Sequence, residues 1–282
     1  RPIAHCEEEY GAESTFVPFD GDGFVDPEDV RKAIRPDTKL VVVNHGSNVL
    51  GVVQAVGEIG RVCREAGVTF CIDAAQTAGV IPIDMKTMHV DIVAFTGHKS
   101  LLGPMGIGGL CVGEEVEIAH SRAGGTGVKS AQRLHLDEYP YRMEFGTPNM
   151  MGIAGLSKGV DYIRDQGGVA KVHAKEMELA AILWEGLCTT DGVTVYCART
   201  LERRTPVFSF NIEGMDPSKV GTRLDVDFDV ACRTGLHCAP LVHEDIGTAP
   251  NGTVRLSIGP LTKKEDVVAA VDAVRELAAE KR

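Results

Sequence analysis

The chain has 282 residues, 44% of them hydrophobic and 24% charged, a composition that excludes a disordered or fibrous protein and predicts a soluble globular one. The formal net charge of −11 argues against nucleic-acid binding, because contacts with a phosphate backbone need clustered Lys and Arg. No apolar run approaches the roughly 18 residues of a membrane span, and the first residues lack the features of a signal peptide. We therefore expect a cytoplasmic protein that does not bind membranes.

The first half of the chain alternates apolar strands with helices. A helix is predicted over residues 26–34, where Asp-Pro-Glu-Asp supplies an N-cap and a proline for the first turn. A second helix is predicted over residues 56–67, because apolar residues repeat there at three-residue spacing and a glycine can end it. Such strands, separated by helices, predict a mostly parallel sheet covered by helices on both faces. The expected strands cover residues 40–45, 68–73, 90–96 and 107–112.

The second half has longer helices and shorter strands. Asp216-Pro217 predicts a helix start, and Thr262-Lys-Lys-Glu265 predicts a capping box that opens the last helix. We therefore expect an α/β large domain over residues 1–148, followed by linking helices and a smaller α+β domain over residues 149–282. The other predicted elements of this half are helices over 150–163 and 169–187 and strands over 193–197, 207–212, 228–232 and 253–258.

The most informative pair in the chain is Asp73 and Lys99, each of which lies at the end of an apolar strand-like run. In a parallel sheet, ligands bind at the carboxyl ends of the strands. A lysine amine and a carboxylate at that edge are what an enzyme needs to hold pyridoxal phosphate. The amine bonds to the cofactor aldehyde, while the carboxylate keeps the pyridine nitrogen protonated. A metal centre is not expected, because no Cys-x-x-Cys spacing occurs among the cysteines.

Five motifs in register resemble the cysteine desulfurases of the class V aminotransferase group. The resemblance spans nearly the whole chain, and it implies the fold type I pyridoxal-phosphate architecture with part of the large domain missing. Five motifs in the same order and spacing are far more specific than any one of them. These motifs are Ser47-Asn48-Val-Leu-Gly51, Asp73-Ala-Ala-Gln76, Thr96-Gly-His98-Lys99, Gly146-Thr-Pro-Asn149 and Arg233-Thr-Gly-Leu-His237-Cys238-Ala-Pro240.

The resemblance assigns cofactor roles to the residues at the sheet edge. Lys99 matches the lysine that bonds the cofactor and carries the proton of the substrate Cα, and Asp73 matches the partner of the pyridine nitrogen. Asp73 is equally suited to cap a helix. The remaining cofactor residues implied are Gln76 and Asn48 at the phenolic oxygen, with Asn48 also able to reach the substrate carboxylate, and Thr96 and His98 at the phosphate.

A glycine-rich loop implies that the active protein is a homodimer. Gly124-Gly125-Thr126 resembles the loop that reaches across the dimer interface to the phosphate in the partner's site, and Thr126 is the ligand it offers. Read without the resemblance, the same loop is a flexible turn.

Cys238 is the residue that selects the reaction. The resemblance implies that its thiolate attacks the sulfur of L-cysteine, leaving a persulfide on the enzyme and releasing L-alanine. His237 is a supporting candidate beside it. Arg255 matches the arginine that takes the substrate carboxylate, with Arg233 as a second candidate, although a surface ion pair is the ordinary role of such residues. A sulfur-acceptor protein is an expected partner.

Two departures from the family pattern leave alternatives open. Leu236 stands where many relatives have a first histidine before His237. The segment that precedes Arg1 in relatives, which carries further phosphate and ring contacts, is not present, so we expect weak cofactor binding by residues 1–282 alone. A selenocysteine lyase could use the same cysteine loop, whereas another class V aminotransferase has no need of Cys238. A non-catalytic dimerisation or docking module is the alternative from a different class.

Overall fold

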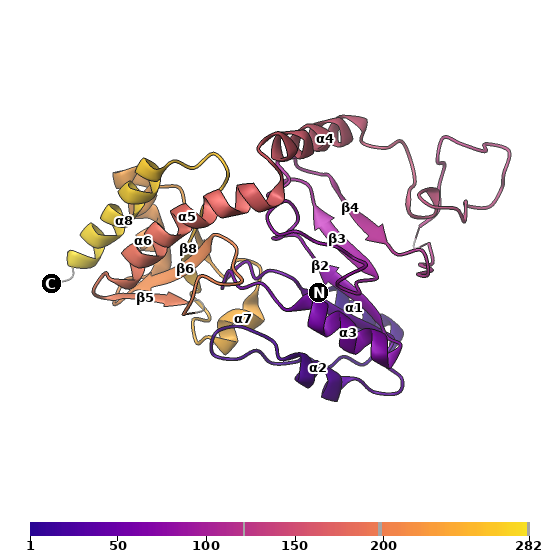
Figure 1. Cartoon of the computed structure of the whole chain (residues 1–282), viewed down its shortest axis with the longest axis horizontal. Helices are drawn as coiled ribbons and strands as arrows, with labels where there is room; N and C mark the ends of the chain where they lie inside the picture. Colours follow the sequence, from indigo (N-terminus) through magenta and orange to yellow (C-terminus); the bar gives the residue numbers. More distant parts are fainter. Residues whose placement is uncertain (121, 197–198, 281–282) are drawn as a thin grey trace.

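The computed structural model describes residues 1–120, 122–196 and 199–280, which form two sheets flanked by helices (Figure 1). The first sheet has the order β1-β2-β3-β4, in which β1, β2 and β3 are parallel and β4 is antiparallel to β3. The predicted mostly parallel sheet is therefore confirmed. Its strands are β1 (Leu40–Asn44), β2 (Thr69–Asp73), β3 (Ile92–Thr96) and β4 (Gly108–Val112).

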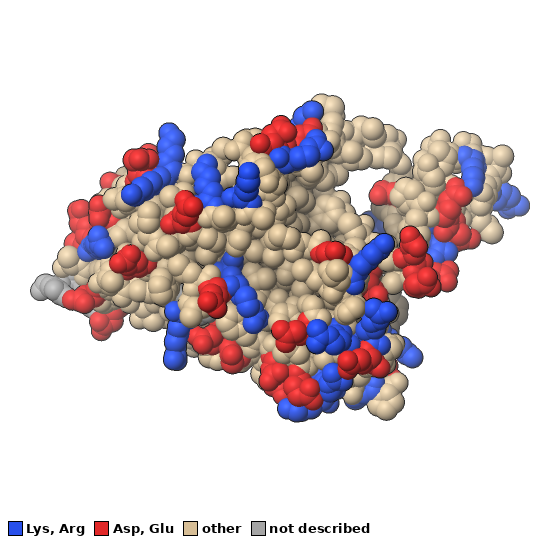
Figure 2. All heavy atoms as spheres, viewed as in Figure 1, with Lys and Arg blue, Asp and Glu red and all other residues tan. Residues whose placement is uncertain are grey.

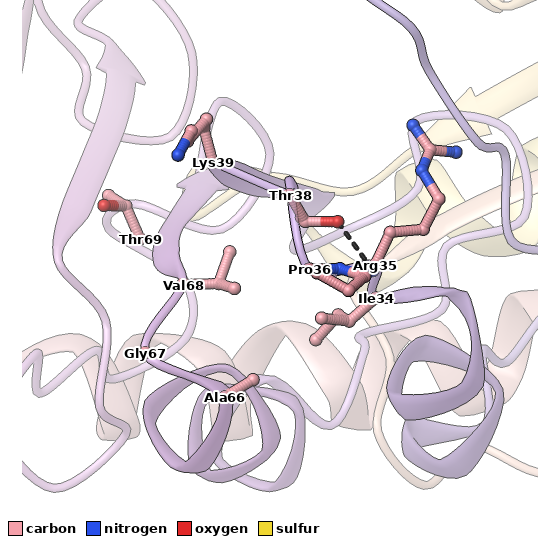
Figure 3. A pocket seen from close by; sticks show the side chains of 9 residues that line it. All are labelled: Ile34, Arg35, Pro36, Thr38, Lys39, Ala66, Gly67, Val68 and Thr69. Atoms are coloured by element: carbon pink, nitrogen blue, oxygen red, sulfur yellow. Dashed lines mark hydrogen bonds between the residues drawn. The ribbon is translucent and has the colours of Figure 1, made fainter.

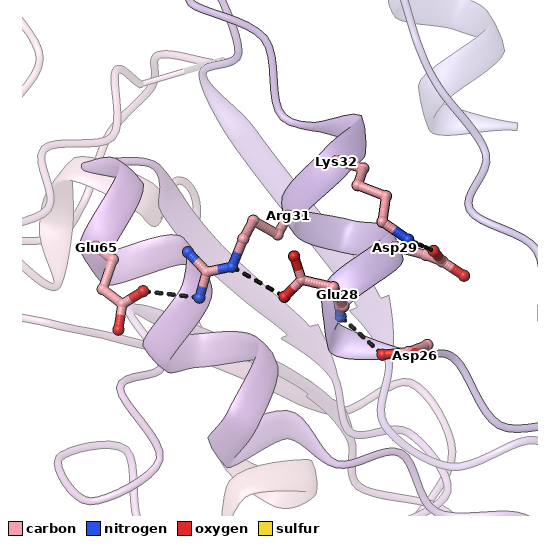
Figure 4. Close-up of polar contacts among 6 residues, drawn as sticks. All are labelled: Asp26, Glu28, Asp29, Arg31, Lys32 and Glu65. Carbon is pink, nitrogen blue, oxygen red and sulfur yellow. Dashed lines mark hydrogen bonds and ion pairs between the residues drawn. The ribbon is translucent and has the colours of Figure 1, made fainter.

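Three helices belong to this first half, and their ends follow the local sequence. Asp26 accepts a hydrogen bond from the backbone of Glu28 and so caps α2 as predicted. Arg31 of α2 bridges Glu28 at 3.2 Å and Glu65 of the next helix at 2.7 Å, which ties the two helices together (Figure 4). These helices are α1 (Pro2–Tyr10), α2 (Pro27–Ala33) and α3 (Val56–Ala66).

The core of the first half lies between α3 and one face of the sheet. Val56, Ile59 and Val62 supply the buried face of α3 that their spacing predicts, and they cluster with Phe70 and Ile72 of β2. Gly67 ends the helix with a positive φ of 67°, the left-handed conformation that glycine adopts readily. This packing fixes the strands whose carboxyl ends carry Asp73 and Thr96.

The second sheet is antiparallel and has the order β5-β6-β8-β7. Its apolar side packs against α5, α6 and α8 in one hydrophobic cluster. The strands are β5 (Val193–Tyr196), β6 (Val207–Ile212), β7 (Arg233–Gly235) and β8 (Thr253–Ser257). The helices of this half are α4 (Met150–Asp165), α5 (Val169–Cys188), α6 (Pro217–Phe228), α7 (Pro240–Asp245) and α8 (Lys264–Ala279), after a short 3-10 helix at Tyr141–Met143.

Two local predictions in the second half are wrong. The apolar run 228–232 is not a strand, because α6 continues to Phe228 and ends at Asp229, whose φ of 54° is left-handed. The last helix begins one residue later than predicted, since the side chain of Asp266 accepts from the backbone of Lys263. The hydroxyl of Thr262 instead accepts from the backbone of Gly259. The end of the predicted strand 193–197 lies outside the described residues.

A buried seam joins the two halves of the chain. The guanidinium of Arg204, which is 1% exposed, donates through Nη2 to the carbonyl oxygens of Leu50 and Val207, each at 3.0 Å. The hydroxyl of Ser209 in β6 donates to the carbonyl of Val49 at 2.7 Å. Gly51 lies so close to β6 that a Cβ atom added to it would approach the carbonyl oxygen of Val207 to 2.4 Å. The loop between β1 and α3, which contains Val49 and Gly51, is therefore held against the second sheet.

The surface carries charges of both signs. On the face shown in Figure 2, Lys and Arg side chains are interspersed with Asp and Glu side chains and form no continuous basic stripe. Within the part of the chain that the structure describes, no helix combines the length and apolar character needed to cross a bilayer.

We predict that Arg204→Ala lowers the free energy of unfolding by about 3 kcal/mol, because buried carbonyls lose their donor. The neighbouring Arg203 is exposed and packs over Phe24, with its guanidinium carbon 4.4 Å from the ring centroid. Arg203→Ala is therefore the matched control, with an expected loss of about 1 kcal/mol or less. Urea unfolding of both variants is the measurement. Equal losses in the two variants would contradict the role of the buried seam.

A second stability prediction concerns Glu176 of α5, which is 2% exposed and whose Oε2 has no hydrogen-bond partner among the described residues. Burial raises its pKa from 4.5 to about 7. The folded state thus holds a proton that the unfolded state releases, so the stabilisation is complete below the unfolded pKa and is lost as pH rises through 7. The free energy of unfolding of Glu176→Gln should equal that of the wild type near about pH 4 and exceed it by about 3 kcal/mol near about pH 8. Parallel stability curves for the two proteins would refute this.

Candidate active site

The predicted site residues of the first half gather at one edge of the parallel sheet. Asp73 ends β2 and is paired in register with Ala94, two residues before the end of β3. Thr96 is the last residue of β3, and His98 and Lys99 follow it closely. Because neighbouring parallel strands finish at the same edge, the carboxylate and the amine emerge together.

Lys99 lies among charged groups from both sheets. Its side chain is exposed, yet the surrounding protein partly desolvates the amine and lowers its pKa. The carboxylate of Asp73 acts in the opposite direction, as does Cys238, while Arg255 and Arg233 lower the pKa further. The structure therefore brings together the lysine and its expected partner with the residues predicted for substrate and sulfur.

Two arginines occupy one face of the second sheet. Arg233 of β7 and Arg255 of β8 are direct cross-strand neighbours, so their side chains lie on the same face. Arg255 donates through Nη1 to the carbonyl of Asn48 at 3.0 Å, and its buried Nε has no hydrogen-bond partner in the described residues. Burial and the charge of Arg233 lower the pKa of Arg255. An anion beside these guanidinium groups would relieve both effects, and a carboxylate has the matching shape.

Cys238 lies on a strained turn directly after β7. His237 and Cys238 have φ angles of 49° and 64°, a left-handed conformation that costs a non-glycine residue about 1 kcal/mol or more each. The exposed Sγ lies 3.4 Å from Nη2 of Arg233. Asn48 donates through Nδ2 to the carbonyl oxygen of His237 at 2.5 Å, which ties the turn to the first sheet. The thiol is thus presented to solvent beside the guanidinium of Arg233.

The ring of His237 is directed into the protein. It is 2% exposed, and its Nε2 lies 3.1 Å from the hydroxyl of Thr253. Burial, together with the charge of Arg255 and the neighbouring His243, lowers its pKa to about 4. The ring is therefore neutral at pH 7, and among the described contacts it bonds to Thr253 and not to the thiol of Cys238.

The remaining predicted residues are placed less uniformly. The hydroxyl of Thr96 and Nδ1 of His98 are 2.7 Å apart, so they form a polar pair at the end of β3. Asp73 accepts from the backbone of Ala75, as a capping residue does, and the half-buried Gln76 follows in the same turn. Thr126 lies in the segment between β4 and α4, which extends away from both sheets in Figure 1. Its hydroxyl donates to the carbonyl of Val128 in the same loop.

Two residues that the sequence reasoning missed lie beneath the cysteine turn. Thr253 is 0% exposed and receives the ring of His237, and His243 of α7 is 0% exposed and packs against that ring. Thr253 lies two residues before Arg255, so strand alternation could have placed both on one face of β8. No local pattern indicates the contact of His243.

A surface cavity of about 520 Å³ lies elsewhere, at the amino ends of β1 and β2 (Figure 3). Arg35, Thr38, Lys39 and Thr69 supply its polar lining, and the lining includes no predicted site residue. The charged cluster is at the opposite edge of the sheet, where parallel strands present their ligand-binding loops.

Comparison of the sequence with known proteins gives consistent matches. A family model described as aminotransferase class-V matches residues 1–269. A probable cysteine desulfurase of Pyrococcus abyssi is 34% identical over 280 residues, which cover 98% of this chain and 68% of that protein. A cysteine desulfurase of Haloferax volcanii is 32% identical over 274 residues, covering 95% and 63%. The chain thus spans about two thirds of the length of these relatives.

Solved structures agree with the sequence matches. The apo cysteine desulfurase of Thermococcus onnurineus NA1 superposes with a TM-score of 0.88 at 34% identity and covers 99% of this chain and 69% of its own. The cysteine desulfurase CsdA (S-sulfonic acid) of Escherichia coli gives a TM-score of 0.90 at 26% identity with the same coverage. The expected α/β fold class is confirmed, and so is the family resemblance that the motifs indicate.

We predict that Asp73→Asn lowers the pKa of Lys99 further, since the carboxylate is the group that most opposes the lowering. The lysine should then react faster with acetic anhydride near pH 8, because only the neutral amine is acylated. Mass spectrometry of the labelled peptide, with the exposed Lys86 as an internal reference, is the measurement. Asp37→Asn removes an exposed carboxylate at the other edge of the sheet and serves as the control. An unchanged Lys99 rate in Asp73→Asn would refute the coupling.

Proposed function

Because the chain belongs to the aminotransferase class-V family, we propose that the protein is a cysteine desulfurase that uses pyridoxal phosphate. It removes sulfur from L-cysteine, releases L-alanine and keeps the sulfur as a persulfide on Cys238. One observation carries the proposal: Asn48, in the loop after β1 at the sheet edge of Asp73, bonds both to Arg255 and to the turn that carries Cys238, which joins the residues of the two halves in one site. The relatives and solved structures are named cysteine desulfurases, so the selenocysteine lyase and transaminase alternatives are not favoured.

The residues at the sheet edge fit the cofactor that this family uses. Lys99 supplies an amine of lowered pKa, and Asp73 supplies a carboxylate within its field. Thr96 and His98 offer a hydroxyl and an imidazole for a phosphate, while Gln76 and Asn48 offer amides. When bound, pyridoxal phosphate supplies an aldehyde that reacts with the amino group of the substrate and a ring that accepts electrons.

Arg255 and Arg233 are assigned to the substrate. The unpartnered buried Nε of Arg255 is a donor that a carboxylate can satisfy, and Arg233 lies across from it in register. A carboxylate held there places the substrate between the second sheet and Lys99. Lys99 then carries the Cα proton, a role favoured by an amine whose lowered pKa lets it exist as the free base more readily.

Cys238 takes the sulfur. Its thiolate forms an S–S bond with Sγ of the substrate as the Cβ–Sγ bond breaks, and the carbon skeleton takes up a proton to leave as alanine. A thiol and cysteine thus become a persulfide and alanine, so no external oxidant is needed. Arg233, with Nη2 at 3.4 Å from Sγ, stabilises the thiolate that must attack. The ring of His237 holds the turn from beneath.

The proposal extends to two protein partners. The loop that carries Thr126 lies in the segment between β4 and α4, which extends away from both sheets (Figure 1), and this suits contribution to the site of a second copy in a homodimer. The thiol of Cys238 is exposed, so a sulfur-acceptor protein can approach it.

We predict that in the full-length protein Cys238→Ala retains the visible absorbance of bound cofactor but loses sulfide release from cysteine by about 100-fold or more. Lys99→Ala should lose the absorbance as well. Cys111→Ala, which removes another exposed thiol, is the matched control and should behave as the wild type. Sulfide release assayed with a thiol reductant is the measurement. Wild-type sulfide release by Cys238→Ala would rule out the persulfide route.

A further inference from the structure

Two buried histidines support the cysteine turn from below. The rings of His237 and His243 lie with centroids 5.7 Å apart at an angle of 47°. Each ring is fixed by a threonine hydroxyl, since Nε2 of His237 bonds to Thr253 at 3.1 Å and Nδ1 of His243 bonds to Thr248 at 2.7 Å. The backbone of Leu236, the residue before His237, also acts on the ring of His243 and raises its pKa against the larger effect of burial. The contact of His243 with the turn is thus made through the ring of His237.

His243 is itself held by a compact loop. Its carbonyl oxygen accepts from the backbone of Thr248 at 2.9 Å and of Ala249 at 3.0 Å. The carbonyl of Thr248 accepts from Gly252 at 2.7 Å, and Gly252 lies against the end of β7, where an added Cβ would approach the oxygen of Gly235 to 2.1 Å. The ring of His243 therefore rests on a base that is fixed to the same strand that carries the cysteine turn.

The turn needs such support because its own conformation is unfavourable. Two successive non-glycine residues with positive φ persist only where their surroundings determine them. The side chain of Cys238 is exposed and lies against Nη2 of Arg233, so it contributes little packing. The conformation then depends on His237, whose carbonyl is held by Asn48 and whose ring is held between Thr253 and His243.

We propose that His243 is a positioning residue for the sulfur-carrying thiol. By packing on His237, it keeps the left-handed turn closed and holds Sγ of Cys238 beside Nη2 of Arg233. This inference rests on the proposed function in one respect only, namely that Cys238 is the residue that accepts the sulfur. The contact itself requires neither cofactor nor substrate, and it is tested through the reactivity of the thiol.

The test is the rate at which iodoacetamide alkylates Cys238 in the full-length protein, followed by mass spectrometry of its peptide from about pH 6 to about pH 10, a range that brackets thiol ionisation. In His243→Ala we expect alkylation at pH 7 to be slower by about threefold or more and the dependence of the rate on pH to change, because Sγ is no longer held beside Nη2 of Arg233. Thr248→Val should have the same effects to a smaller extent. His243→Phe, which keeps a planar ring against His237 but cannot bond to Thr248, should restore at least half of the rate.

The control for a merely structural effect is Val271→Ala, which truncates a buried residue in the helical core of the same half. It should lower the unfolding midpoint and leave the alkylation profile unchanged. A wild-type profile in His243→Ala, or a shift no larger than that of Val271→Ala, overturns the proposal. If His243→Ala does not fold, Thr248→Val decides by the same criterion. A shifted profile in a protein that releases no sulfide from cysteine would support the role of His243 and contradict the proposed function.

Discussion

A fully buried guanidinium, that of Arg204, joins the two sheets, and the site depends on that connection. It fixes the carbonyl of Leu50, two residues after Asn48, against β6. Asn48 in turn donates to the carbonyl of His237, in the turn that carries Cys238, and accepts from Arg255. A loop that was free to move relative to the second sheet would lose both bonds. The relative positions of Cys238 and Arg255 therefore depend on a contact made in the interior, at Arg204.

The charge pattern of the site is opposite to that of the molecule. The chain has a net charge of −11, yet Lys99, Arg233 and Arg255 interact with one another around a single carboxylate, Asp73. Partial burial, and to a smaller extent repulsion from the neighbouring cations, lowers the pKa of Lys99 and of Arg255. Such a concentration of cations favours a ligand with several negative groups, as a phosphate and a carboxylate together provide. Binding would thus relieve an electrostatic cost that the free site carries.

The sequence predicts the parts of the site that depend on strand ends and leaves out those that depend on long-range packing. Asp73 and Lys99 could be placed at one edge because parallel strands finish together. The strand predicted over residues 228–232 is wrong because apolar periodicity alone does not distinguish the end of a helix from a strand. The left-handed conformation of Asp229, which ends α6, has no strong local sequence signal. His243 reaches His237 through ring packing between α7 and the cysteine turn, which no spacing rule describes.

The strained turn follows from a conflict between two requirements on one residue. Glycine is the residue that adopts positive φ at least cost, but it has no thiol, and a sulfur carrier has to project from the surface to meet both substrate and acceptor. A cysteine at the apex of the turn supplies the exposed thiol, but its positive φ is unfavourable, so neighbouring residues have to stabilise that conformation. His237 is suited to this because one planar side chain fills the space beneath the turn and hydrogen-bonds at its far end. An aliphatic residue of similar size would fill that space and leave the hydroxyl of Thr253 without this partner, so the identity of the residue before the cysteine is set by the support it gives.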